Sequence, residues 1–259
     1  MKDFFCARVL ENNKLAESIF DLRLSCPKVT AEAEAGQFLS IYTGSPAMLL
    51  PRALSICEIN KGEGSLRIVY RIAGEGTKAI SAFKSGDNVK IIAPLGNAFK
   101  VDAGKKITIV GGGIGSPPLL ELAKKVRRNV PDSSISVFLG FRSVNEVILK
   151  QDFAECADYL SIATNDGSCG TKGTVMDLLE SSATPEIVYA CGPHIMLKNV
   201  AAWAEKGDIP CYVSMEERMA CTVGACLACV VKVRQNGEII QKTVCANGPV
   251  FDSKELVWE

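Results

Sequence analysis

Four cysteines near the end of the chain have the clearest chemical spacing in the sequence. Four residues separate Cys221 from Cys226, two separate Cys226 from Cys229, and Cys245 follows after fifteen more. This C-x4-C-x2-C…C order is the plant-type spacing for ligating a [2Fe–2S] cluster. The residues between the first three cysteines are mostly small, which lets a loop curl around a cluster and aim N–H groups at its sulfurs. The spacing therefore predicts that Cys221, Cys226, Cys229 and Cys245 are metal ligands.

Structural zinc and free thiols are the alternatives for these cysteines. Zinc sites usually combine two C-x2-C pairs, or one such pair with two histidines. This chain has one C-x2-C among the four, and its single histidine, His194, lies far away in the sequence. The spacing favours iron–sulfur over zinc.

A glycine-rich turn follows an apolar run in the middle of the chain. Its glycines permit a tight turn and let a pyrophosphate approach the backbone at the start of a helix. It is not G-x-G-x-x-G, and Arg142 rather than an acid follows the next expected strand. A tight turn that binds no nucleotide is the alternative. The glycines assigned to a nicotinamide nucleotide are Gly111, Gly112, Gly113 and Gly115.

Three short segments upstream could hold a second, phosphate-bearing aromatic ligand. They are Arg52-Ala53-Leu54-Ser55, Val69-Tyr70-Arg71 and Gly76-Thr77. Arg52 offers a fork for a phosphate, Tyr70 an aromatic face, and Gly76-Thr77 a helix start with free N–H groups. Each segment alone is a weak signal, since Tyr70 could equally be a core residue and Arg71 a solvated one.

The elements that must position these residues fall into three regions. Residues 1–102 show period-two alternation with Gly and Pro between short runs, which predicts an antiparallel β-barrel with one helix at 77–83. Residues 103–216 alternate strands (107–110, 135–139, 159–163, 187–190 and 211–214) with helices (119–126, 144–153, 174–179 and 195–204). That order predicts a parallel sheet whose ligands bind beyond the carboxyl ends of the strands. Residues 217–259 are too few for a core of their own and predict a hairpin turning at Asn236-Gly237.

Composition excludes several classes of protein. The chain has 259 residues, of which 47% are hydrophobic, and a net charge of zero. Such a chain can bury cores, and it has no broad basic field for nucleic acid. It has no apolar run of about 18 residues and no secretory h-region, so we expect no membrane span and no export. Eleven cysteines, an odd number, indicate a reducing cytoplasm rather than a disulfide framework.

The order of these motifs resembles the ferredoxin–NADP reductase superfamily, which couples an R-x-x-S flavin barrel to a nicotinamide domain. The resemblance adds Cys191, Gly192 and Pro193 to the nicotinamide site. With the cysteine segment, the whole chain resembles the electron-transfer subunits of NAD-dependent (class B) dihydroorotate dehydrogenases. Ala53 stands where that family commonly has proline, and Thr222 where it commonly has glycine.

The resemblance implies an oxidoreductase subunit for electron transport in pyrimidine biosynthesis. It implies FAD in the barrel, one [2Fe–2S] cluster in the tail, and NAD as substrate. It also implies a partner subunit with FMN that oxidises dihydroorotate, with two copies of each chain in a heterotetramer. No catalytic side chain is assigned, because a single histidine supports no triad, and His194 is expected to start a helix. The alternatives are a flavin and iron–sulfur subunit of a ferredoxin- or sulfide-linked NAD(P) oxidoreductase, which Arg142 would favour, and a zinc-stapled assembly module.

Overall fold

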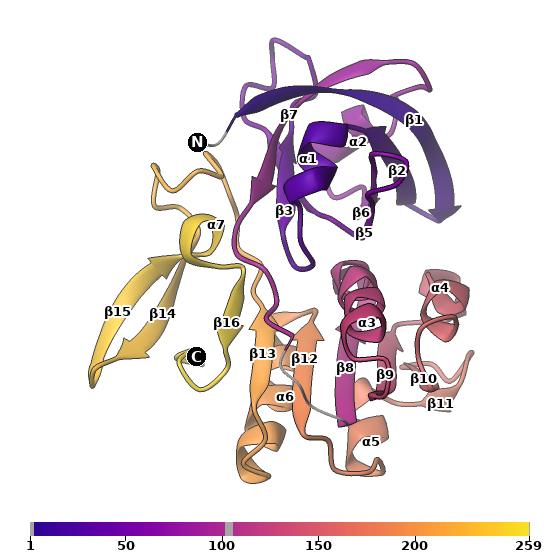
Figure 1. Ribbon diagram of the computed structural model, residues 1–259, viewed down its shortest axis with the longest axis vertical. Coiled ribbons are helices and arrows are strands. Elements are labelled where there is room, and N and C mark those ends of the chain that lie inside the picture. Colours follow the sequence, from indigo (N-terminus) through magenta and orange to yellow (C-terminus); the bar gives the residue numbers. More distant parts are fainter. Residues whose placement is uncertain (1–2, 102–105, 259) are drawn as a thin grey trace.

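Alternating apolar residues in the first part of the chain produce a curved antiparallel sheet (Figure 1). The computed structural model describes residues 3–101 and 106–258, so the expected boundary at 102/103 lies outside the described residues. The sheet has the order β4-β3-β7-β1-β2-β6-β5, and β4 contacts β6, which curls it into the expected barrel. Its elements are β1 (Phe4–Ala16), β2 (Ile19–Ser25), α1 (Pro27–Glu32), β3 (Phe38–Ile41), β4 (Arg52–Ser55), β5 (Glu58–Asn60), β6 (Ser65–Arg71), α2 (Glu75–Ile80) and β7 (Asn88–Leu95).

The second sheet is parallel over six strands, in the order β11-β10-β9-β8-β12-β13. Helices α3 and α4 pack on one face, and α5 and α6 on the other (Figure 1). The elements are β8 (Lys106–Gly112), η1 (Gly113–Gly115), α3 (Pro118–Asn129), β9 (Ser134–Phe141), η2 (Val144–Glu146), α4 (Lys150–Ala154), β10 (Tyr159–Thr164), β11 (Thr171–Lys172), α5 (Val175–Glu180), β12 (Ile187–Cys191), α6 (His194–Lys206) and β13 (Cys211–Ser214). None of the described helices is long and apolar enough to cross a bilayer.

One helix prediction in this region is wrong. Residues 144–153 do not form a single helix, because Leu149 adopts a left-handed backbone angle (φ 57°) between η2 and α4. A left-handed residue cannot continue a right-handed helix, so the chain turns and restarts. The expectation that α6 begins at His194 is confirmed.

The tail does not stand apart from the second sheet. It comprises β14 (Val230–Gln235), β15 (Glu238–Thr243), α7 (Val244–Asn247) and β16 (Val250–Asp252). The hairpin turns at Asn236 and Gly237, both with positive φ, as expected for a two-residue turn. Strand β16 then pairs antiparallel with β13 and extends the parallel sheet into a mixed one. The apolar side chains of β14 share a core with α6 and β13.

A buried ion network joins the barrel to the second sheet. Arg67 on β6 is 9% exposed and binds Asp21 (2.9 Å) and Glu58 (3.4 Å) within the barrel, and Asp152 on α4. Lys124 on α3 binds Glu58 from the other side at 2.6 Å. Charged groups this buried require partners, so the network holds the two domains in one arrangement.

Candidate functional site

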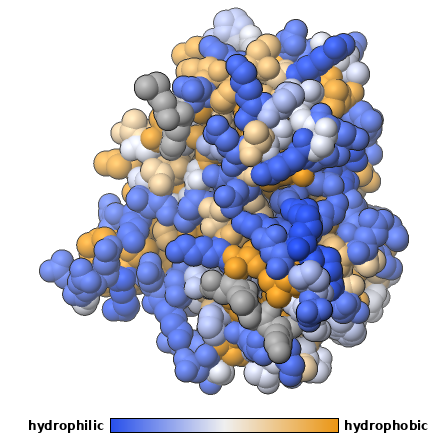
Figure 2. Space-filling view, in the orientation of Figure 1, coloured by the Kyte–Doolittle hydropathy of each residue, from blue (hydrophilic) through white to orange (hydrophobic). Residues whose placement is uncertain are grey.

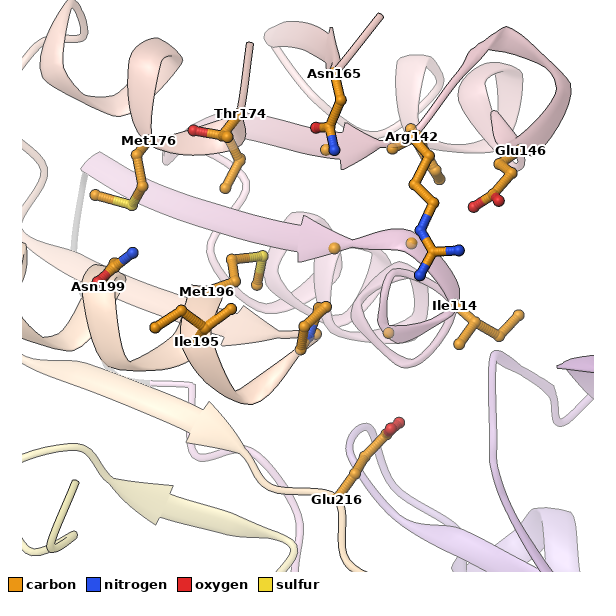
Figure 3. Close-up of a pocket in the computed structure, with 18 of the residues that line it drawn as sticks. Ile114, Arg142, Glu146, Asn165, Thr174, Met176, Ile195, Met196, Asn199 and Glu216 are labelled. Carbon is orange, nitrogen blue, oxygen red and sulfur yellow. The ribbon is translucent and has the colours of Figure 1, made fainter. Parts of the chain in front are cut away.

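A cavity of about 470 Å³ lies at the carboxyl ends of the parallel strands, where the fold predicts a ligand. Its walls come from the glycine turn after β8, the ends of β9 and β10, the starts of α5 and α6, and Arg71 of the barrel. Figure 3 shows Met176 and Asn199 toward one end and Arg142 and Glu146 toward the other. An elongated cavity with a glycine turn in one wall suits a dinucleotide.

The glycines of the turn do different work. Gly113 has φ +53° and no atom within 4 Å of an added Cβ, so its backbone faces open space in the cavity wall. An added Cβ on Gly115 would lie 2.5 Å from the Gly192 Cα, so Gly115 lets the turn pack backbone to backbone on the C-G-P segment. Five of the residues that the sequence assigned to a nicotinamide nucleotide line this cavity: Gly112, Gly113, Gly115, Gly192 and Pro193.

Two residues assigned to the nucleotide lie behind the cavity wall instead. Gly111 and Cys191 are paired in register within the sheet, both are buried, and neither lines the cavity. Burial raises the pKa of the Cys191 thiol far above its ordinary value. Both residues therefore support the turns that follow them.

Glu216 is a cavity residue that the sequence reasoning missed. It follows β13 by two residues and points into the cavity from the wall opposite Met176 (Figure 3). Glu216 is an exposed residue, and the protein packed around its carboxyl still raises the pKa of that group by desolvation. The rule that ligands bind beyond the carboxyl ends of strands could have identified it.

Asn199 and Met196 on α6 were missed as well, although both follow the C-G-P segment within one or two helical turns. On the barrel side, Arg71 forms an ion pair with Glu146 at 2.9 Å, which joins the two domains at the cavity.

The second predicted site lies on the barrel, where Arg52 and Gly76 meet. The Arg52 guanidinium lies so close to the backbone of α2 that a Cβ on Gly76 would be 1.9 Å from its Nε. Arg52 donates to the carbonyl of Leu50 at 2.6 Å, and no carboxylate in the described part of the chain pairs with it. A cation without a counter-ion beside a helix start fits a phosphate.

The side chain of Tyr70 does not face this site. It is 2% exposed, its ring packs on Phe20, and its hydroxyl donates to the Asn12 Oδ1 at 3.2 Å. The idea that the ring offers a face to an aromatic ligand is therefore wrong. A ligand contact by Tyr70 would have to come from its backbone, which stays a prediction, as do the roles of Ala53, Leu54, Ser55, Val69 and Thr77.

The four predicted metal ligands come together as two pairs. The Cys226 N–H donates to the Cys221 Sγ at 3.3 Å, and the Cys245 N–H donates to the Cys229 Sγ at 3.5 Å. Among residues 3–101 and 106–258, no three His, Cys, Asp or Glu side chains surround a common point. A tetrahedral zinc ion needs four ligands around one point, whereas a [2Fe–2S] cluster has two irons and four cysteines. Two pairs of cysteines supply the four ligands that a cluster of two irons requires.

Backbone groups of the loop already point at the sulfurs. The Cys221 Sγ accepts from the N–H groups of Ala225 and Cys226, each at 3.3 Å. Burial raises the pKa of Cys221, but backbone hydrogen bonds outweigh it and lower the pKa to about 6. Burial raises the pKa of Cys245 to about 11, helped by the neighbouring Cys229. The backbone around Cys221 thus stabilises the thiolate of this residue, the form that binds metal.

The outer edge of this loop is exposed. Cys226 is exposed, and the apolar side chains of Val223 and Leu227 are 38% and 66% exposed, whereas Cys229 and Cys245 are buried. Figure 2 shows apolar side chains on the left side of a mainly hydrophilic surface, where Figure 1 places the loop beside the barrel. An exposed apolar rim next to a metal centre is a place where a partner can approach it.

Comparison with known proteins gives consistent matches over the whole chain. Residues 216–257 match the iron-sulfur cluster binding domain of dihydroorotate dehydrogenase B. The chain is 36% identical over 264 aligned residues to the dihydroorotate dehydrogenase B (NAD(+)) electron transfer subunit of Desulforamulus reducens, covering 100% of both. It is 41% identical to the same subunit of Bacillus caldolyticus, covering 96% of each.

Solved structures share the fold. An NADH-dependent reduced ferredoxin–NADP oxidoreductase, studied for flavin-based electron bifurcation, aligns with a TM-score of 0.87 and 31% identity, covering 100% of this chain and 92% of that one. The cytochrome b5 reductase domain of Ulva prolifera nitrate reductase aligns at 0.63 with 18% identity, over 76% and 89% of the two chains, which shows the fold alone.

Proposed function

Because this chain belongs to the family of electron-transfer subunits of the NAD-dependent dihydroorotate dehydrogenase B, we propose that it passes electrons from dihydroorotate oxidation to NAD⁺ in pyrimidine biosynthesis. It is an oxidoreductase subunit that works with FAD and a [2Fe–2S] cluster. Its partner is a dihydroorotate dehydrogenase catalytic subunit, which we propose carries FMN and assembles as two copies of each chain in the cytoplasm. The proposed domains are residues 1–102, 103–216 and 217–259.

One observation carries the proposal: the cavity that we assign to nicotinamide is lined both by the second sheet and by Arg71 of the barrel. Arg71 lies in a predicted flavin segment and also lines the cavity, and its ion pair with Glu146 crosses the domain boundary. A hydride donor and acceptor must lie in contact, so a nicotinamide site has to open on the flavin site.

The residues of the chain have separable tasks in this proposal. Arg52 and the N–H groups at the start of α2 hold the flavin pyrophosphate, and the open backbone at Gly113 accepts the nicotinamide pyrophosphate. The four cysteine sulfurs ligate iron, and N–H groups aimed at Cys221 stabilise its thiolate. When bound, flavin exchanges a hydride with nicotinamide and single electrons with the iron–sulfur cluster. Nicotinamide accepts only hydrides and the cluster only single electrons, so flavin is needed between them. The exposed rim of Val223 and Leu227 faces the partner.

Reconstitution tests the proposal. The isolated chain should oxidise NADH with an artificial acceptor, but it should not oxidise dihydroorotate. Adding the catalytic subunit should confer dihydroorotate-dependent NAD⁺ reduction. Replacing Cys226 by Ser should lower this coupled activity and abolish the reduced-state EPR signal, while NADH oxidation by the artificial acceptor largely persists. Coupled activity at the parent rate without the cluster would refute the electron path.

A second candidate is a ferredoxin-linked NADP oxidoreductase with the same cofactors. Arg142 lines the cavity, and a cation there can hold the 2′-phosphate of NADP. The measurement that separates the two is the ratio of kcat/KM for NADH and NADPH. A strong preference for NADPH that is lost in Arg142→Ala would favour this candidate.

A further inference from the structure

A buried pair of hydroxyl groups connects the cysteine loop to the barrel. The Ser40 Oγ on β3 donates to the Thr222 Oγ1 at 2.6 Å, and the Thr222 hydroxyl donates onward to the carbonyl of Cys221, also at 2.6 Å. Ser40 and Thr222 are both 0% exposed, although they lie 182 positions apart in the sequence. Buried hydrogen bonds of this length exclude water and strongly constrain their groups.

The backbone of Thr222 needs such support. Its φ is +63°, in the left-handed region that β-branched residues rarely adopt. Glycine would accept this angle without strain, but it carries no hydroxyl. A threonine persists in this conformation only where its surroundings hold it there, and the hydroxyl chain from Ser40 to Cys221 does so.

Both ends of the hydroxyl chain lie next to proposed cofactor groups. Ser40 on β3 pairs with Ala53 on β4, and the next residue of β3 pairs with Arg52. At the other end, Cys221 is a proposed iron ligand whose sulfur already accepts two backbone hydrogen bonds. The hydroxyl chain therefore connects the strand pair β3–β4, which carries Arg52, to Cys221, the first proposed metal ligand.

The other end of the tail is attached to the barrel separately. Asn97, which follows β7, donates from Nδ2 to the Val250 carbonyl at 2.8 Å and accepts from the Val250 N–H at 2.9 Å. This clamp adjoins α7, which carries Cys245, and leaves the loop with the first three cysteines untouched. Ser40 thus acts on a part of the tail that Asn97 does not reach.

We propose that Ser40 and Thr222 form a positioning pair that sets the orientation of the cysteine loop, and of the metal centre it holds, against the flavin barrel. The inference rests on the proposed function for the presence of the cluster. Without the pair, the Cys221 carbonyl loses a buried donor, and Thr222 is free to leave its left-handed angle. The N–H groups that point at the Cys221 sulfur then move, and such groups tune the reduction potential of a cluster.

The test uses the complete chain purified with its cluster. Ser40→Ala and Thr222→Val each remove one hydroxyl with little change in shape, and Thr222→Ser retains the hydroxyl. Thr30→Val is a matched control, because Thr30 is also buried and bonds a carbonyl, that of Pro27, on α1 of the barrel. The readouts are the EPR spectrum of the reduced protein, the cluster reduction potential, and the half-life of its visible absorption in an iron chelator.

We expect Ser40→Ala and Thr222→Val each to change the EPR line shape and potential, and to shorten the half-life about tenfold or more, as outer-shell changes at metal sites do. The double variant should be no worse than the more severe single one, because both remove the same contact. Thr222→Ser should keep the parent spectrum. Thr30→Val should change thermal stability alone.

Several results would overturn the inference. Unchanged spectra and half-lives in both single variants would do so, as would effects that add fully in the double variant. Should Thr222→Val fail to fold, Ser40→Ala alone decides, since it leaves the loop sequence intact. If the parent chain itself shows no [2Fe–2S] signal, the proposed function fails as well, which distinguishes that failure from the failure of the pair.

Discussion

Gly76 offers a way to displace Arg52 from the proposed flavin site while every backbone N–H group of α2 is kept. Its missing Cβ leaves room for the Arg52 guanidinium, whose Nε, Cζ and Nη2 would lie 1.9, 2.3 and 2.4 Å from an added Cβ. In Gly76→Ala the guanidinium must move by about 1.5 Å to reach ordinary van der Waals distance. A flexible side chain moves more cheaply than backbone, so we expect Arg52 to yield and α2 to stay in place.

The two consequences of Gly76→Ala have opposite signs. Alanine in a helix is favoured over glycine by roughly 0.5–1 kcal/mol, so the free energy of unfolding should not fall. Displacing Arg52 removes a charge-assisted hydrogen bond to phosphate, which is worth about 1.5–3 kcal/mol. The dissociation constant for FAD should therefore rise about ten- to a hundredfold.

Flavin fluorescence titration of the apoprotein, together with thermal unfolding, measures both effects. Gly62→Ala is the control, since its Cβ would meet only the Asn60 Oδ1, at an ordinary 3.5 Å. Arg52→Ala should bind FAD about as weakly as Gly76→Ala, and the double variant no more weakly than either one. Parental affinity in Gly76→Ala, or fully additive losses in the double variant, would refute the assignment of Arg52 to the flavin phosphate.

Three further predictions concern the cavity and the domain interface, and thermal unfolding and NADH kinetics test them. Arg67→Met leaves the buried Asp21 without its ion-pair partner and should lower the free energy of unfolding by about 3–5 kcal/mol, and so Tm by about 6–20 °C. Adding Asp21→Leu should restore most of this stability. A fall in Tm of under about 2 °C in Arg67→Met would contradict the network. Because the pKa of Glu216 is raised, the native state keeps the proton of this carboxyl to higher pH than the unfolded chain does, and the group makes stability fall as pH rises above 4.5. Glu216→Gln should therefore be more stable than the parent at about pH 8, with no advantage below 4.5. Gly113→Ala should raise KM for NADH and lower the free energy of unfolding by about 1–2 kcal/mol, because Gly113 has a left-handed backbone angle. Gly115→Ala should mainly lower Tm, because its Cβ would lie 2.5 Å from the Gly192 backbone. Similar effects of both variants on KM would contradict the separate roles.

Local patterns were sufficient to predict most elements of both sheets. Side-chain alternation predicted the antiparallel character of the first sheet, and the Asn236-Gly237 pair predicted the hairpin, because each signal depends on neighbours in the sequence. The extent of strand β1 is not visible in the sequence, because its second half, Glu11-Asn12-Asn13-Lys14, is polar and resembles a loop. The break between η2 and α4 could not be predicted either, because Leu149 is an apolar residue with a left-handed backbone angle that no sequence pattern indicates.

The candidate site was less accessible to sequence reasoning, because its geometry depends on distant parts of the chain. Spacing alone predicted the four cysteines as ligands, but their arrangement as two pairs requires α7 to return Cys245 to Cys229. Tyr70 looked available and is buried, since the curl of the barrel decides which face is inside. Glu216 carries no motif, and only the position of β13 in the sheet brings it to the cavity.

One short segment of chain connects the cavity at the ends of the parallel strands with the cysteine loop, and this constrains how the effects of substitutions there must be interpreted. Strand β13 ends at Ser214, Glu216 then lines the cavity, and Cys221 follows within the same unpaired stretch. The segment is held on one side by the bond from the Met215 N–H to the Pro249 carbonyl at 2.8 Å, and on the other by Thr222 on Ser40. A change at Glu216 that loosened the segment would alter the cluster as well as NADH binding. A direct role of Glu216 at the cavity therefore requires that Glu216→Gln change NADH kinetics while the EPR spectrum of the cluster stays that of the parent.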